Sequence, residues 1–153
     1  MRLDHDAFLD VVKSTPLVAI DLIVRDPQDR ILLGLRRNAP ARDLWFVPGG
    51  RILKGEALVD AFGRIGRDEL GLELSMEDAR FVGVYEHLYP DNFAGLAGVG
   101  THYVVLAHEV RLSAEIASMP KTQHREFRWI HPAELAEAED VHPYSRAYSR
   151  ALA

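Results

Sequence analysis

Cysteine is absent from the sequence. Its absence excludes disulfide bonds, metal sites built on thiolates and a cysteine nucleophile, and it is typical of a protein that works in a reducing cytoplasm. Long apolar runs are absent as well, since none approaches the ~20 residues of a membrane-spanning helix. The acidic first residues, MRLDHDAFLD, lack the apolar stretch of a secretory signal. We therefore expect a cytoplasmic protein without a membrane partner.

Positive charge is outweighed by negative charge. The 153 residues include 18 lysines and arginines and 23 aspartates and glutamates, which gives a formal net charge of -5. Nucleic acid is therefore not the expected partner. We expect a small charged ligand instead, bound by positively charged side chains that lie close to its site. The length suits one compact domain, so we expect residues 1–153 to form a single domain.

The spacing of apolar residues predicts an α/β fold. Residues 4–14 repeat apolar side chains at helical intervals, and the run LVAIDLIV at 17–24 is typical of a strand that is covered on both faces. Further strands are expected at 31–37, 45–50, 80–89, 101–112 and 126–130, and helices at 56–70, 132–138 and 143–151. This order favours a mixed sheet with helices on both faces. The glycine-rich segment 91–100 is expected to be a mobile loop, which either closes over a ligand or forms a plain turn.

The stretch WFVPGGRILKGEALVDAFGRIGRDELGL, residues 45–72, joins a glycine loop to a helix. Its glycines, acids and arginine fall at set intervals, at Gly50, Glu56, Arg64, Asp68, Glu69 and Gly71. These intervals resemble the box of the Nudix hydrolases, in which glycine, glutamate, an arginine-glutamate pair and two further glutamates precede a final glycine. The resemblance implies a loop and a helix that hold a divalent metal ion beside a pyrophosphate.

One departure from this box is chemically informative. Ile65 stands where the box has the glutamate after its arginine. Positions 65 and 69 lie one helical turn apart and share a face, so Glu69 is the carboxylate that remains there. A single carboxylate holds Mg2+ loosely unless carbonyl oxygens and substrate phosphates complete its coordination, and fewer metal ions activate water less well for attack on phosphorus. A solvated helix acid is the alternative interpretation of Glu69.

Segments outside the box resemble one branch of the family, the GDP-mannose mannosyl hydrolases. They are STPLVAIDLIV, LLGLRRNAPARDLWFVPGGR, HLYPDNFAG, THYVVL, QHREFRW and VHPYSRAY, and the likeness extends from about Phe8 to Tyr148. That branch also lacks the glutamate that Ile65 replaces here. The resemblance implies a Nudix-like mixed β-sheet sandwiched between helices, a homodimer, and a requirement for Mg2+, with Mn2+ as a substitute ion.

The same resemblance implies the reaction. Water would attack the anomeric carbon of GDP-mannose, or of GDP-glucose, and release GDP and a sugar of inverted configuration. The residue chemistry agrees with this reaction. Direct displacement by water needs no nucleophilic side chain, and arginine forks fit the oxygens of a departing diphosphate.

Roles for individual residues are implied as well. The metal ligands map to the backbone carbonyl of Gly49 and to the side chains of Glu69 and Gln123, and the general base maps to His124. The other implied positions are Arg36, Arg51 and Arg64 at the diphosphate, and Asp21 and Tyr103 as further active-site residues. Two further candidates come from the residues themselves, namely His87 at the sugar and Phe8 stacked on the guanine.

Several of these residues have a structural alternative that the sequence leaves open. Asp21 interrupts an apolar strand, where a salt bridge explains it as well as a supporting role near the metal. Phe8 has packing by the first helix as an equal alternative, and Gln123 and His124 would be ordinary in a surface loop. The aromatic residues expected in the core are Trp45, Phe46 and Trp129.

Two other functions also remain open. A conventional Nudix pyrophosphohydrolase would direct water to phosphorus and yield GMP and mannose 1-phosphate, and Ile65 argues against it. The second alternative is a nucleotide-sugar binding module without activity. The presence of Glu69, Gln123 and His124 argues against that alternative.

Overall fold

The computed structural model describes residues 2–113 and 126–152. Its centre is a mixed β-sheet with the strand order β3-β2-β1-β6-β5, in which β4 also pairs with β1 and β7 with β2. The strands are β1 (Leu17–Arg25), β2 (Ile31–Leu35), β3 (Trp45–Phe46), β4 (Gly49–Arg51), β5 (Ala79–Tyr89), β6 (Thr101–Arg111) and β7 (Phe127–Ile130). Strand β1 runs parallel to β6 and antiparallel to β2 and β4.

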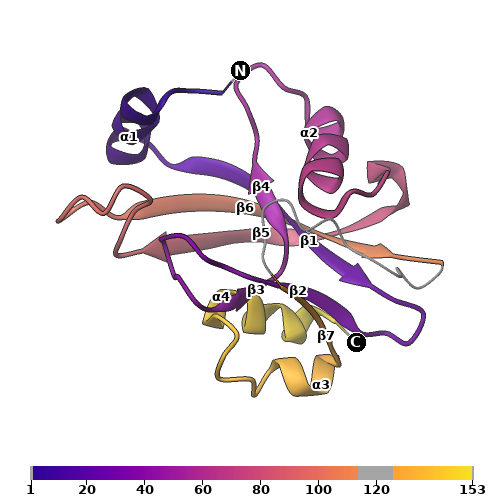
Figure 1. Ribbon diagram of the computed structural model, residues 1–153. Coiled ribbons are helices and arrows are strands. Elements are labelled where there is room, and N and C mark those ends of the chain that lie inside the picture. The colour runs from indigo at the N-terminus through magenta and orange to yellow at the C-terminus, as the bar shows by residue number, and fades with distance from the viewer. Residues whose placement is uncertain (1, 114–125, 153) are drawn as a thin grey trace.

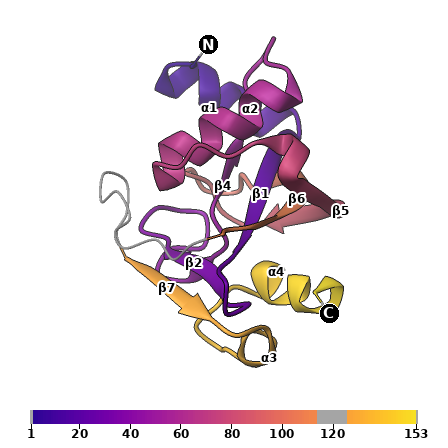
Figure 2. The ribbon, with the colours of Figure 1, turned by 90° about the vertical axis from the view of Figure 1, so that its right-hand side faces the viewer.

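Helices cover both faces of this sheet (Figure 1 and Figure 2). Helices α1 (His5–Ser14) and α2 (Leu58–Ile65) lie on one face, and α3 (Pro132–Leu135) and α4 (Pro143–Arg146) lie on the other. The described residues also form three short helical segments, η1 (Gly66–Leu70), η2 (Met76–Asp78) and η3 (Ala147–Ala151). The predicted α/β fold with a mixed sheet between helices is confirmed. None of the described helices has the length and apolar character needed to cross a membrane.

Strand β1 separates two hydrophobic cores. Ile20, Leu22 and Val24 are fully buried and pack into one core with residues of α2. Ile23 packs into the other core with Tyr148 of η3. Because alternate residues of a strand point to opposite faces, this arrangement explains the continuous apolar run in the sequence. Asp21 therefore shares the face of Ile23.

The helix after the glycine loop differs from the prediction. The sequence predicted one helix over 56–70, whereas α2 ends at Ile65 and the chain continues as a π turn, η1. At the junction, a β-carbon on Gly66 would come within 3.2 Å of the Leu72 carbonyl oxygen and of the Leu74 side chain. The returning chain thus passes so close that an added β-carbon would require its neighbours to shift by a few tenths of an ångström. Gly71, with a φ of 66°, ends η1 in the left-handed conformation that glycine favours.

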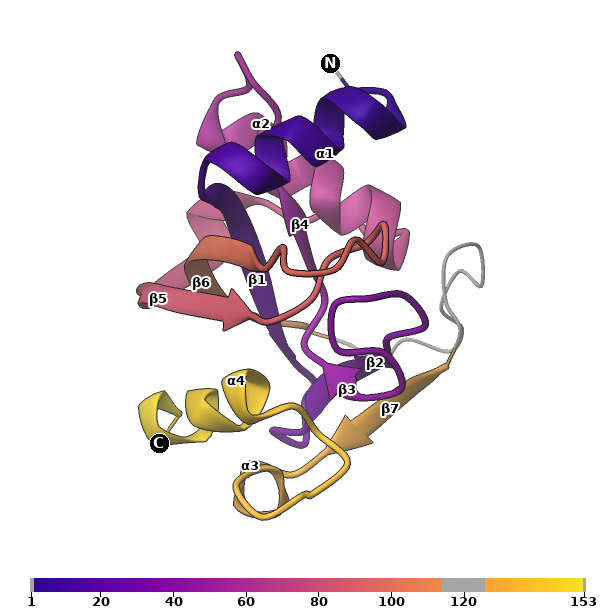
Figure 3. The same ribbon diagram turned by 90° about the vertical axis from the view of Figure 1, so that its left-hand side faces the viewer.

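The loop between β5 and β6 is tied together by one side chain. Asn92 is 1% exposed. Its amide nitrogen donates to the carbonyl oxygens of Leu96 and Val99, and its amide oxygen accepts from the backbone N–H groups of Ala94 and Leu96. In Figure 3 the loop lies below α1, on the side nearest the viewer. The glycine content of this segment does not predict such a tie.

Candidate active site

The junction of β1 and β4 brings the glycine loop against Asp21. In this antiparallel pair Asp21 lies opposite Gly49, and Ile20 lies opposite Gly50. A β-carbon at position 49 would lie 2.5 Å from Asp21 Oδ1 and 2.6 Å from the Ile20 carbonyl oxygen, and one at position 50 would lie 3.2 Å from Ile65 Cγ1. The two glycines therefore allow the loop to lie against the strand and the helix together.

Three adjoining cavities surround this junction. Their walls include most of the described residues predicted for the site, namely Asp21, Arg36, Gly49, Arg51, Arg64, Glu69, His87 and Tyr103. The first cavity, of about 190 Å³, is lined by Gly49 and Glu69. The second, of about 100 Å³, shares Gly49 with the first and reaches Asp21 and His87. The third, of about 200 Å³, shares Glu69 with the first and Tyr103 with the second.

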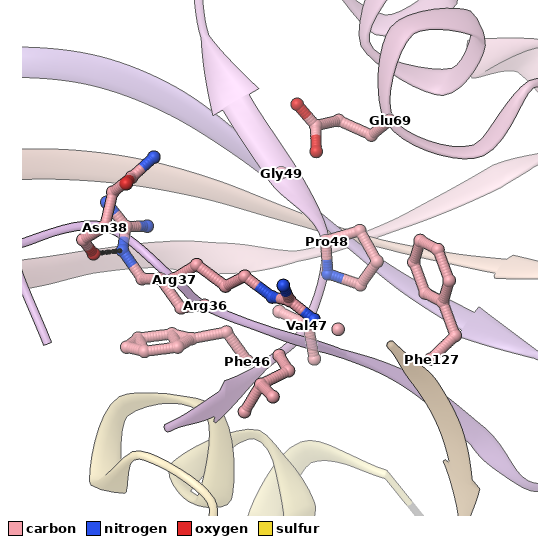
Figure 4. Close-up of a pocket in the computed structure, with 11 residues that line it drawn as sticks. Arg36, Arg37, Asn38, Phe46, Val47, Pro48, Gly49, Glu69 and Phe127 are labelled. Carbon is pink, nitrogen blue, oxygen red and sulfur yellow. Dashed lines mark hydrogen bonds between the residues drawn. The ribbon is translucent and has the colours of Figure 1, made fainter. Parts of the chain in front are cut away.

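Glu69 and Gly49 both line the first cavity. Figure 4 shows the Glu69 carboxylate projecting from the helical segment toward the strand that carries Gly49. Carboxylate and backbone carbonyl oxygens are ligands that hard divalent cations accept, so the chemistry of these two residues fits a metal ion. Within residues 2–113 and 126–152, no group of three or more His, Cys, Asp or Glu side chains gathers to hold a metal. A metal ion here would therefore also need backbone, amide or substrate oxygens.

Ile65 accounts for the small number of acids at this cavity. Its side chain is 1% exposed and belongs to the core between α2 and the sheet. Two other acids of the box are engaged by a cation, because Arg64 donates to both Glu56 and Asp68. Glu69 is thus the box carboxylate that lines the first cavity.

Asp21 is the buried acid of the second cavity. Its Oδ2 accepts a 2.6 Å hydrogen bond from the Tyr148 hydroxyl. Burial raises the pKa of Asp21 to about 7, while the Tyr148 hydrogen bond and the positive charge of Arg36 oppose this rise. Sequence reasoning considered a salt bridge for Asp21, and the structure gives it a tyrosine partner instead. The carboxyl group therefore titrates close to neutrality.

His87 lies in the wall of the same cavity. The residue is 6% exposed, and its Nε2 is buried without a hydrogen-bond partner among the described residues. Burial, and secondarily the charge of His142, lowers the pKa of His87 to about 4, so the imidazole is neutral at pH 7. A neutral ring nitrogen without a partner among residues 2–113 and 126–152 is suited to a hydrogen bond with a ligand hydroxyl.

Arg36 and Arg51 bring positive charge to the cavities from two segments. Arg36 follows β2, donates through Nε to the Asn38 carbonyl oxygen at 3.1 Å, and lies 5.6 Å from the centre of the Phe46 ring. The Arg51 guanidinium lies 3.9 Å from the centre of the Phe8 ring. Burial lowers the pKa of Arg51, although arginine side chains stay protonated in proteins. Both residues are therefore placed to meet an anion.

Phe8 connects α1 with the site. Its ring is partly buried and lies 4.8 Å from the ring of Phe93 in the loop between β5 and β6. The Phe8 ring also contacts the guanidinium of Arg51. Packing of the first helix was one of the two roles considered for Phe8, and these contacts supply it. They also place an aromatic surface next to the cation at the third cavity.

Arg64 holds the glycine loop to α2. It donates to both carboxylate oxygens of Glu56 at 2.7 and 3.0 Å, to the Arg51 carbonyl oxygen at 2.7 Å and to Asp68 at 3.3 Å. Glu56 in turn accepts from the backbone N–H of Leu53 at 3.0 Å. The sequence predicted a contact between Arg64 and the diphosphate. In the structure most of its donors bind the protein instead.

Aromatic residues without a predicted site role complete the cavity walls. Tyr89 lies two residues beyond His87 on β5 and lines the second cavity, together with the predicted residue Tyr103, which is opposite His87 on β6. Phe46 was expected in the core, but it is only partly buried and lines the first and second cavities. The period of two in a strand is the signal that could have paired Tyr89 with His87. No comparable signal exists for Tyr148, which reaches Asp21 from a distant segment.

Two predicted residues lie outside the described part of the chain. They are Gln123, expected as a metal ligand, and His124, expected as the general base. The structure therefore brings together the glycine loop, Glu69, the arginines and the buried acid of the predicted site. The roles of Gln123 and His124 stay predictions.

The fold and the site together point to one family of proteins. They consist of a mixed sheet between helices and a glycine loop that leads into α2. A family model described as the NUDIX domain matches residues 15–152. The chain belongs to the Nudix hydrolase family. Enzymes of this family act on nucleoside diphosphate derivatives and generally use divalent metal ions such as Mg2+.

Individual proteins resemble this chain to different degrees. The low-salt glycan biosynthesis protein Agl8 of Haloferax volcanii is 37% identical over 152 residues, which cover 99% of this chain and 91% of that protein. The MutT protein from Methanosarcina mazei Go1 has a TM-score of 0.70 at 15% identity, and the match covers 90% of this chain and 93% of that protein's chain. The MutT NUDIX hydrolase from Burkholderia pseudomallei has a TM-score of 0.68 at 21% identity, and the match covers 92% of this chain and 100% of that protein's chain. The two structural likenesses concern the fold.

Proposed function

We propose that the protein hydrolyses GDP-mannose, and also GDP-glucose, to GDP and free sugar by attack of water at the anomeric carbon with inversion. The observation that carries this proposal is the position of Ile65. This residue is buried in the core where the family box has a glutamate, and Glu69 is the box acid at the first cavity. Such a site is poor in the carboxylates that gather metal ions beside phosphorus, and carbon–oxygen cleavage does not need them.

The residues suit a departing nucleoside diphosphate. As the bond between the anomeric carbon and the diphosphate oxygen breaks, negative charge grows on GDP. The guanidinium groups of Arg36 and Arg51 would stabilise that charge. Gly49 and Glu69, with Gln123, would hold Mg2+, which when bound supplies further positive charge to the diphosphate. Arg64 is assigned to keep the loop of Arg51 in place, because it donates to the Arg51 carbonyl oxygen.

Water must lose a proton as it attacks the sugar. His124 is the proposed base, since a neutral imidazole with a pKa of about 6.5 accepts a proton near pH 7. His87 and Asp21, which line one cavity, are proposed to contact the sugar and to support the site. Tyr103 is proposed to stand with them in the active site, and Phe8 to present its ring to the guanine.

The relative from Haloferax volcanii supports a sugar nucleotide as substrate. That protein is named for glycan biosynthesis, and glycans are assembled from activated sugars. The proposal is thus a cytoplasmic enzyme acting on a nucleotide sugar of the GDP-mannose class.

Hydrolysis in oxygen-18 water tests where the water attacks. We expect GDP as the nucleotide product, label in the free sugar and none in phosphate. Label in GMP or in a sugar phosphate would establish attack on phosphorus, as in a conventional pyrophosphohydrolase. Absence of any product from GDP-mannose, GDP-glucose and ADP-mannose in the presence of Mg2+ would favour a binding module instead.

A homodimer is part of the proposal. Strand β5 is at one end of the strand order, and its side chains Phe81, Val84 and Leu88 are 55%, 61% and 56% exposed. Pairing of two copies through this surface would remove them from water. We expect light scattering to give twice the chain mass for the wild type and the chain mass for Val84→Glu. A wild-type monomer at micromolar concentration would contradict this assembly.

A further inference from the structure

A segment near the end of the described chain reaches the buried acid of the site. Tyr148 in η3 is 0% exposed, and its hydroxyl donates to Asp21 Oδ2 at 2.6 Å. The two residues are 127 positions apart in the sequence. The reaction described above gives Tyr148 no role.

The hydrogen bond from Tyr148 orients the whole carboxylate. Oδ2 is held by the tyrosine, whereas Oδ1 lies against the glycine loop, 2.5 Å from where a β-carbon of Gly49 would be. The last torsion of an aspartate side chain is otherwise broad, so fixing one oxygen fixes the other. The ring of Tyr148 is itself packed edge-on against Tyr85, with centroids 4.8 Å apart and an interplanar angle of 86°.

His87 is supported from the same segment. The ring of Tyr144 stacks on the His87 imidazole, with centroids 4.4 Å apart and an interplanar angle of 1°. The Tyr144 hydroxyl donates to the Leu88 carbonyl oxygen at 2.7 Å and accepts from the Leu88 N–H at 3.0 Å. At the other end of the residue, the Tyr144 N–H donates to His142 Nδ1 at 3.0 Å. The surface beneath His87 is thus anchored at two points.

We propose that Tyr148 and Tyr144 are positioning residues, of which Tyr148 fixes the Asp21 carboxylate and Tyr144 fixes the His87 ring. The inference rests on the proposed function, because that function assigns the roles of Asp21 and His87. Neither tyrosine lines the three cavities, and each contacts a residue that does. Residues 143–151 therefore complete the active site from the face of the sheet that α3 and α4 cover.

A double-mutant cycle tests the role of Tyr148. Tyr148→Phe keeps the ring and removes the hydroxyl, and we expect kcat to fall about tenfold, with KM changed less than about threefold. In an Asp21→Ala protein the same substitution should change kcat less than about twofold, because no carboxylate remains to be oriented. An equal loss in both backgrounds would overturn the assignment.

A crystal structure of Tyr148→Phe provides a readout that is independent of turnover. We expect the Asp21 carboxylate to rotate away from its present orientation against Gly49. An unchanged carboxylate would overturn the positioning role. The matched control is Tyr85→Phe, which removes a hydroxyl from the ring packed against Tyr148 and should leave both kcat and the Asp21 orientation unchanged.

Substitution of Tyr144 separates the stacking surface from the hydroxyl. We expect Tyr144→Leu to lower kcat/KM about tenfold and Tyr144→Phe, which keeps a flat ring beneath His87, to stay within about threefold of the wild type. Wild-type kinetics for Tyr144→Leu would overturn the assignment. A wild-type protein that releases no GDP from any GDP-sugar would refute the proposed function itself, whereas an active wild type with unaffected tyrosine variants would refute only this inference.

Discussion

Glu56 and Arg64 form a two-pronged ion pair that joins the loop after β4 to helix α2, with nitrogen–oxygen distances of 2.7 and 3.0 Å. Their side chains are 15% and 20% exposed. Arg64 also donates to the Arg51 carbonyl oxygen, so one cation fixes both ends of the loop. Planar pairs of this kind are among the stronger hydrogen-bonded contacts in proteins.

Removing this pair should destabilise the fold. We expect Glu56→Gln to lower the free energy of unfolding by about 2 kcal/mol, because Arg64 loses a charged partner where water reaches it poorly. Urea denaturation followed by circular dichroism measures the change. The control is Glu73→Gln, since Glu73 and Arg67 form a 3.5 Å pair with side chains 82% and 52% exposed, and its loss should cost less than about 0.5 kcal/mol. Equal effects of the two substitutions would show that the pair does not hold the loop.

Acid should destabilise the protein through His87. Its folded pKa of about 4 lies below the value of about 6.5 expected in the unfolded chain. As the pH falls below 6.5, the imidazole therefore binds a proton in the unfolded state, whereas in the folded state it stays neutral until the pH approaches 4. The His87 contribution to the free energy of unfolding should decrease by up to about 3 kcal/mol between pH 6.5 and 4, and it is fully present above pH 6.5. The raised pKa of Asp21 acts in the opposite direction over this range, so the His87 contribution has to be measured as a difference between two proteins.

His87→Gln isolates this contribution. As the pH is lowered from 7 to 4, the unfolding free energy of the wild type should fall by up to about 3 kcal/mol relative to that of the variant, and the Asp21 contribution, which both proteins share, cancels in this difference. Burial also lowers the pKa of His142, but that residue is present in both proteins and cancels in the comparison. His5→Gln, at a side chain that is 63% exposed, serves as control and should leave the slope unchanged. A wild-type slope in His87→Gln would contradict the prediction.

Gly49 should not accept a side chain. In Gly49→Ala the new methyl group would meet Asp21 Oδ1 at 2.5 Å and the Ile20 carbonyl oxygen at 2.6 Å, and we expect a loss of about 3 kcal/mol in stability and a large loss of turnover. Gly55 has a φ of 81° with nothing within 4 Å of an added β-carbon, so Gly55→Ala should cost only about 1 kcal/mol of backbone strain. Thermal unfolding and GDP release distinguish the two. A Gly49→Ala protein as stable as Gly55→Ala would mean that β1 and β4 can separate freely.

His124 should be needed for turnover more than for binding. We expect His124→Gln to lower kcat by about 10²–10⁴-fold, the usual contribution of a general base, with a smaller change in KM. Steady-state kinetics with GDP-mannose measure both constants. His131→Gln, at an exposed position beside α3, is the matched control and should be unaffected. Near-wild-type kcat in His124→Gln would remove this residue from the mechanism.

Local sequence patterns predicted the strands and the loop well. The apolar run around Asp21 is buried on both sides in β1, because the strand has helices on each face. The interval from Gly50 to Glu69 placed the loop and the acid-bearing segment correctly relative to each other, since both features are short-range. Ile65 could likewise be recognised from sequence as a lost carboxylate, and its burial gives the replacement a physical reason.

Contacts between distant segments could not be predicted in this way. The partners of Arg64 depend on how the loop turns back over α2, and the π turn after Ile65 depends on the close passage of residues 72–74. The hydrogen bond between Tyr148 and Asp21 joins two segments that are 127 positions apart in the sequence. Intervals in a single sequence carry no information about such pairs, whereas aligned sequences that vary together would.

The distance along the chain between Asp21 and Tyr148 has a consequence for synthesis on the ribosome. Every described strand precedes residue 131, so a nascent chain has all of these strands before the tyrosine emerges. During that interval the face of the sheet that carries Asp21 lacks both its helical cover and the hydrogen-bond donor of the aspartate. We therefore expect a translating chain to complete this second core and its working active site together, after the last helical segment has left the exit tunnel.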